Sequence, residues 1–295
     1  MGYVFLAIAI FSGIVKGYCG KKTSGFVEGY KDAMVANLIR MILCIFIGAG
    51  VIFMNGDTKF MLPDAKVLAI TAMSGITTSC FVVSWLLSVR KGAYMMIDVF
   101  LMLGVLVTIL LGRIFFNENI ELNQFVGMAV LLLSVIIMCS YNNSIKEKIS
   151  ITSFLLLIMC GLSNGLTDFS QKLFVKQAEG LPISVFNFYT YVFSALTLVL
   201  FYIFSKEKHE NKDDRNIKKI SGYILVMAIC LFVNSYFKTV AAKYLDSAIL
   251  YPLNQGMALI LSSIMAATLF KEKLTVKAIV GLILAFSGLL IINLL

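Results

Sequence analysis

Long apolar runs follow one another along the whole of this chain. Each run holds about twenty residues, the length that an α-helix needs to cross the hydrocarbon core of a bilayer. The composition agrees, because 60% of the residues are hydrophobic and only 14% are charged, whereas a soluble domain is about a quarter charged. The sequence therefore predicts an all-α integral membrane protein with ten transmembrane helices, at approximately residues 2–19, 33–54, 67–89, 93–113, 121–141, 151–174, 182–205, 220–242, 246–270 and 275–294.

A large soluble helical protein is the alternative. Its helices would be amphipathic with a period of about 3.6 residues, but these runs are apolar all round. The first run starts at Met1 without a basic segment or a small-residue cleavage site, so we expect an uncleaved first helix. The connections are short, the longest covering residues 206–219, and we expect no attached ATPase or sensor domain.

One segment occurs twice. The sequence L-F-K-E-K-L-T-V-K-A-I-V-G at residues 269–281 aligns with F-F-N-E-N-I-E-L-N-Q-F-V-G at residues 115–127, which places Glu118 opposite Glu272. Weaker matches, such as Lys21 with Lys172, extend the likeness. We expect two five-helix repeats, residues 1–141 and 150–295. Because five is odd, the second repeat must enter the membrane from the opposite side, as in transporters with inverted repeats and a substrate site near the midplane.

Several motifs resemble the drug/metabolite transporter superfamily, specifically its ten-helix EamA-type members. They are A-A-K-Y-L-D-S-A at 241–248, Y-P-L-N-Q-G at 251–256, the segment from Phe270 through Gly281 to Gly288, and the first-half copy from Phe116 to Gly127. The likeness covers nearly the whole chain. The first half departs from the pattern at residues 94–98, which lack a counterpart of Pro252.

The resemblance implies a secondary active transporter, monomeric or homodimeric, in the plasma (inner) membrane of a bacterium. Members of the family move amino acids, nucleotide sugars, phosphorylated sugars, choline, nucleobases or lipophilic cations. We expect alternating access for a small polar or amphipathic metabolite, with an amino-acid-like zwitterion as a candidate and proton coupling or exchange as candidate modes. A channel and a lipid-handling, flippase-like protein remain alternatives.

Ionisable side chains within a span are costly, by about 2.5–3.5 kcal/mol at the bilayer centre on insertion scales. We interpret them as two gate clusters at opposite ends of a path. One cluster lies toward the loops opposite the termini and the other toward the termini. The alternative is that the cations extend to the nearer interface. Asp98 and Asp168 are also candidate proton carriers, or else permanently paired carboxylates. The two clusters are Lys16, Arg40 and Asp98, and Asp168 and Lys238.

Polar residues spaced by three, four or seven positions share a helix face and predict a central path. Serine and threonine at such positions also serve close helix packing. Trp85 is either a cap over a bound solute or an interfacial anchor. The predicted pathway residues are Trp85, Asn164, Asn187, Tyr191, Asn234, Tyr251, Asn254 and Gln255.

Other functions find little support. The single histidine, His209, lies in a charged loop, and the six cysteines form no C-x-x-C motif, so we expect no metal, no cofactor and no enzymatic step. The net charge of +9 is spread over short loops, which indicates membrane orientation rather than nucleic-acid binding. We expect the small-molecule substrate and the lipid bilayer to be the partners.

The orientation of the chain receives conflicting predictions. Most lysine and arginine residues lie in the loops opposite the termini, and the positive-inside rule makes that side cytoplasmic. The family resemblance implies cytoplasmic termini, which we adopt. Glu118 and Glu272 precede helices and are expected to satisfy free backbone N–H groups there. Gly127, Gly281 and Gly288 are expected to permit close helix contact.

Overall fold

A computed structural model describes residues 1–27, 29–91, 94–141, 151–205, 214–271 and 276–294. His209 and Glu272 lie outside these ranges. The described residues form ten α-helices, one short 3-10 helix and no strand. The elements are α1 (Gly2–Ser24), α2 (Tyr30–Asn55), η1 (Asp57–Phe60), α3 (Ala65–Lys91), α4 (Tyr94–Phe116), α5 (Leu122–Tyr141), α6 (Ile151–Gln177), α7 (Ile183–Phe204), α8 (Asp214–Ala241), α9 (Ser247–Leu269) and α10 (Val276–Leu294).

The helices have the length and composition of membrane spans. Within the described ranges, seven are long and apolar enough to cross a bilayer. The other three, α4, α5 and α10, carry shorter apolar stretches at Phe100–Phe116, Leu122–Ser134 and Ile279–Ile292. Each helix falls on one of the ten predicted runs. The main differences are polar extensions, because α8 already begins at Asp214 and α6 continues to Gln177.

The distribution of side chains is that of a protein surrounded by lipid. Large apolar side chains point outward, such as Phe11, Phe46 and Phe53, which are 70%, 69% and 80% exposed. Polar and charged side chains are instead buried, including Asn187 and Asp168. A surface of this kind is favourable in hydrocarbon, where polar groups are costly unless they face the interior. The prediction of an all-α integral membrane protein is confirmed.

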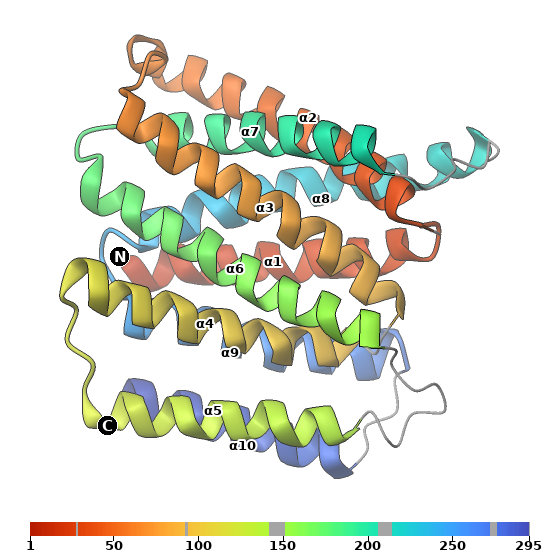
Figure 1. Cartoon of the computed structure of the whole chain (residues 1–295), viewed down its shortest axis with the longest axis vertical. Coiled ribbons are helices and arrows are strands. Elements are labelled where there is room, and N and C mark those ends of the chain that lie inside the picture. Colours follow the sequence, from red (N-terminus) through yellow and green to blue (C-terminus); the bar gives the residue numbers. More distant parts are fainter. Residues whose placement is uncertain (28, 92–93, 142–150, 206–213, 272–275, 295) are drawn as a thin grey trace.

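The helices run roughly side by side, and the two chain ends lie at the same edge (Figure 1). Helix α1 contacts α8, and α6, five helices after α1, contacts α3, five helices before α8. Three further contacts pair helices five apart: α2 with α7, α4 with α9 and α5 with α10. Exchanging α1–α5 with α6–α10 therefore leaves this set of contacts unchanged, as expected for two related five-helix units.

Small residues allow the closest of these approaches. A Cβ on Gly104 of α4 would lie 2.8 Å from the backbone nitrogen of Gly165 on α6, too close for any other residue type without movement. Between α5 and α10, a Cβ on Gly127 would lie 2.7 Å from the carbonyl oxygen of Gly288. The expected packing role of Gly127 and Gly288 is confirmed, since glycine lets backbones of membrane helices meet.

Candidate functional site

A polar cavity of about 70 Å³ lies where six helices meet. Three of these helices, α1, α3 and α4, come from the first half of the chain, and α6, α8 and α9 come from the second. We call it the central cavity. The residues that line it are Ile10, Gly13, Lys16, Gly17, Phe81, Trp85, Asp98, Leu101, Asn164, Asn234, Lys238, Asn254, Gln255 and Ala258.

Two smaller cavities adjoin Lys16. One of about 40 Å³ is also lined by Asn164, Tyr191 and Lys238. The other, of about 10 Å³, lies between Lys16 and Arg40. Phe81 lines all three, and its ring centroid lies 5.7 Å from Lys16 Nζ, within range of a cation–π interaction. Lys16 is therefore the cation that all three cavities share.

An ion pair lies beside the central cavity. Lys238 Nζ on α8 donates to Asp168 Oδ1 on α6, and the two residues are 6% and 1% exposed. Asn164 Nδ2 lies 3.5 Å from the other carboxylate oxygen, and the hydroxyl of Tyr251 donates to the Asp168 carbonyl at 2.7 Å. Buried charges need such partners, because an unpaired one carries the full cost of its desolvation.

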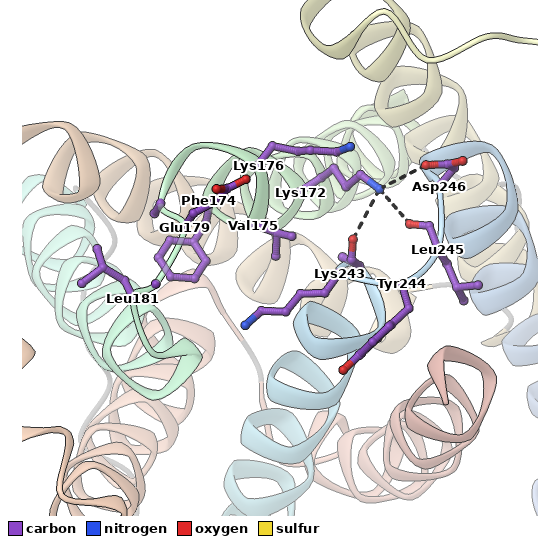
Figure 2. Close-up of a pocket in the computed structure, with 13 residues that line it drawn as sticks. Lys172, Phe174, Val175, Lys176, Glu179, Leu181, Lys243, Tyr244, Leu245 and Asp246 are labelled. Carbon is purple, nitrogen blue, oxygen red and sulfur yellow. Dashed lines mark hydrogen bonds and ion pairs between the residues drawn. The ribbon is translucent and has the colours of Figure 1, made fainter.

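A larger, open pocket of about 370 Å³ lies at the end of α6 and the α8–α9 connection (Figure 2). We call it the vestibule. Lys172 of α6 and Ala242, the residue that follows α8, line it. Each is four residues, or about one helical turn of 5.4 Å, beyond Asp168 and Lys238 respectively.

On the side away from the vestibule, the residues one helical turn from the ion pair belong to the central cavity. Asn164 and Asn234 line the central cavity, and each is one turn before its partner in the ion pair. The pair Asp168–Lys238 therefore lies between the central cavity and the vestibule.

A second polar cluster closes the vestibule end of the helices. Lys172 Nζ lies 3.3 Å from Glu118 Oε1 and 3.9 Å from Asp246 Oδ1. It also donates to the carbonyl oxygens of Leu245 at 2.7 Å and Ala242 at 3.4 Å (Figure 2). The cluster joins α6 to the segments preceding α5 and α9. The sequence aligns Lys172 with Lys21 but does not predict these contacts, which join residues far apart in the chain.

Glu118 performs its expected role, but on another helix. Its Oε2 accepts the backbone N–H of Ser247, at the start of α9, over 3.2 Å. At the start of α5, the free N–H of Glu121 is instead accepted by Gln124 Oε1 at 3.0 Å. This second contact is one half of a capping box. The side chain of Glu118 thus links the two halves of the chain.

Most predicted pathway residues meet at these cavities. The central cavity is lined by Trp85, Asn164, Asn234, Asn254 and Gln255, and the 40 Å³ cavity by Tyr191. Trp85 is 6% exposed and packs on Gly20, where any Cβ would meet its ring. It is therefore not an interfacial anchor.

Two predicted pathway residues lie beside the cavities rather than on them. Tyr251 is fully buried and bonded to Asp168. Asn187 Oδ1 accepts the hydroxyl of Ser235 at 2.6 Å, and Ser235 in turn accepts Gln171 Nε2 at 3.3 Å. This chain of hydrogen bonds connects α7, α8 and α6, and fixes the wall of the 40 Å³ cavity.

The prediction of two charge clusters at opposite ends is wrong in its geometry. Lys16, Asp98 and Lys238 line the same central cavity, so members of the two predicted clusters meet there rather than at opposite ends of a path. Lys16 and Arg40 form no ion pair with any described residue. Of the two predicted clusters, only Asp168 and Lys238 form their expected pair.

Comparison with known proteins agrees with this architecture. A solved structure described only as "Crystal structure of protein" shares the fold, with a TM-score of 0.71 over 99% of this chain and 96% of that chain, at 11% sequence identity. No curated protein matches the chain. Residues 151–294 match the model of the EamA-like transporter family. Through this match the second half of the chain, residues 151–294, is assigned to the EamA-like transporters of the drug/metabolite transporter superfamily, whose members are multi-pass membrane transporters of small molecules rather than enzymes.

Proposed function

We propose that the protein is a secondary active transporter that moves a small polar or amphipathic metabolite by alternating access. The lining of the central cavity by α1, α3 and α4 together with α6, α8 and α9 carries this proposal. Under the exchange of halves seen in the helix contacts, these two sets correspond to each other. Residues 1–141 and 150–295 are the proposed repeats, and rocking of one against the other would expose the cavity to each side in turn.

The ion pair Asp168–Lys238 is the proposed gate between the central cavity and the vestibule. Opening the vestibule side would separate α6 from α8. Asp168 and Lys238 would then lose their contact with each other and interact with water or solute instead. The Lys172 cluster lies one turn further out and would open in the same movement. A carrier differs from an open channel in that its path is never open to both sides of the membrane at once.

Three further features are proposed from the family resemblance: a bacterial plasma membrane location, a monomer or homodimer, and coupling to protons or exchange of solutes. Asp98 and Asp168 are the candidate proton carriers because they are carboxylates within membrane spans. The cavity is small and is lined by charged and amide side chains, which favours a water-soluble substrate over a lipid.

Counterflow in proteoliposomes tests the proposal. Vesicles are loaded with an unlabelled solute from a panel of amino acids, monocarboxylates, nucleobases, sugars, nucleotide sugars and organic cations, and uptake of the labelled solute is followed. A carrier gives saturable, transient accumulation that requires the internal solute. Flux that rises linearly with concentration and shows no counterflow would identify a channel, and redistribution of labelled lipid alone would identify a flippase.

A further inference from the structure

Arg40 of α2 is a buried cation without an ion-pair partner among the residues that the structure describes. The residue is 3% exposed, and its Nε and Nη2 atoms have no hydrogen-bond partner. It forms no ion pair with a described residue. A buried donor without an acceptor is costly, more so when it is charged. The local fold therefore holds a buried arginine with two nitrogens that have no acceptor among the described residues.

The two available nitrogens have a specific geometry. Nε and Nη2 share one edge of the planar guanidinium group and present two parallel N–H donors. That edge matches the two oxygens of a carboxylate in a bidentate pair. The 10 Å³ cavity that Arg40 lines is about the size of one water molecule or one carboxylate oxygen.

Charge and continuity extend the site toward the central cavity. Lys16 lines both the small cavity and the central one, as do Phe81 and Trp85. Lys238 is neutralised by Asp168, whereas Lys16 and Arg40 have no carboxylate partner among the described residues. An anionic group placed between Lys16 and Arg40 would be stabilised by both cations.

We propose that Arg40 and Lys16 form a carboxylate subsite, so that the transported solute is a small carboxylate whose remaining part occupies the central cavity. This inference rests on the proposed transport function and specifies its substrate class. Monocarboxylates and amino acids share the recognised group. Asp98, on the lining of the central cavity, is placed to interact with the amino group of an amino acid.

Thermal unfolding of the purified full-length protein provides the test. The probes are the twenty amino acids and straight or branched monocarboxylates of two to six carbons, each compared with its neutral amide. We expect at least one acid to raise Tm while its amide does not. If the deaminated analogue of an active amino acid raises Tm as much as the amino acid does, the site binds monocarboxylates. If the analogue does not raise Tm, the site binds zwitterions.

Arg40→Lys keeps the positive charge but removes the two parallel N–H donors that bind a carboxylate in a bidentate manner. It should raise the Kd of the active acid about tenfold or more, the effect of losing a charge-assisted hydrogen bond. Arg40→Gln should abolish the shift, whereas Arg113→Gln, at the exposed end of α4, should leave it unchanged. The unliganded Tm and the gel-filtration profile report whether each variant folds, and Arg40→Lys remains informative if Arg40→Gln does not.

Three results overturn the carboxylate subsite. They are no shift by any acid, equal shifts by acids and their amides, or an unchanged Kd in Arg40→Lys. Counterflow of sugars, nucleobases or organic cations together with any of these results would leave the transport proposal intact and remove only the subsite. Absence of counterflow for every solute in the panel would instead remove the transport proposal.

Discussion

Lys238 of α8 and Asp168 of α6 form a buried ion pair at the edge of the central cavity, which Lys238 lines, and one helical turn inward from the vestibule. The pair joins two helices of the second half, while the cavity beside it is lined by both halves. Its position makes it both a structural contact and the proposed gate, and these two roles can be measured separately.

Removing one member of this pair should destabilise the protein. Asp168→Asn or Lys238→Met leaves an uncompensated charge in the interior, which typically costs about 3–5 kcal/mol. Removing both charges should cost less than the sum, because no unpaired charge remains. Thermal unfolding of the two single variants and the double variant measures the coupling. Strictly additive losses would mean that the two side chains do not interact.

Glu118 should stabilise the contact between the halves. Glu118→Ala removes the partner of Lys172 and the acceptor for the N–H of Ser247, and each lost interaction of this kind is worth about 1–3 kcal/mol. Glu118→Gln should cost less, because its amide oxygen can still accept the N–H group. Unfolding in detergent measures both.

Glu121→Gln is the matched control for Glu118, since the side chain of Glu121 is exposed and lies three residues away. It should change stability by less than about 0.5 kcal/mol, as is usual for surface sites. A loss in Glu121→Gln equal to that in Glu118→Gln would assign the effect to general charge rather than to the Lys172 cluster.

The contact between α4 and α6 should tolerate no side chain larger than hydrogen at its closest point. Gly104→Ala places a Cβ against the backbone of Gly165, and overpacking of this kind typically costs about 1–3 kcal/mol. Gly50→Ala, where a Cβ meets nothing within 4 Å, is the control and should not destabilise the protein. Similar unfolding temperatures for Gly104→Ala and the wild type would show that the two helices can separate without cost.

The ion pair should shield the central cavity from reagents in the vestibule. In a background with all native cysteines replaced, Lys243→Cys, exposed in the vestibule, should react rapidly with a membrane-impermeant maleimide. Asn234→Cys, one turn inward of Lys238, should react slowly from that side. Adding Asp168→Asn should accelerate labelling of Asn234→Cys and leave Lys243→Cys unchanged. Rapid labelling of Asn234→Cys with the pair intact would contradict a closed gate.

The fold was largely predictable because lipid imposes a simple rule on it. A chain made of successive apolar runs must cross the membrane repeatedly. The ends of these runs predicted most helix boundaries to within a few residues. The pairing of Asp168 with Lys238 was also predictable, because two unpaired charges within spans demand a partner.

The lateral arrangement of charges was not predictable from the sequence. Depth along a helix can be read from residue position, and it placed Lys16 and Lys238 at opposite ends. Which charges meet depends on helix crossings, and these are set by contacts such as Gly104 with Gly165. The side chain of Glu118 illustrates the same limit, since its capping role was expected but its target, α9, lies more than a hundred residues away.

The most direct test of the gated carrier is charge reversal in counterflow. Once a transported solute is identified, uptake is measured for Asp168→Lys, Lys238→Asp and the double reversal, at equal amounts of folded protein in the vesicles. Each single reversal places two like charges together and should reduce transport at least tenfold, whereas the double reversal restores the pair and should recover much of the activity. A double reversal no more active than the single variants would contradict an ion-pair gate between Asp168 and Lys238.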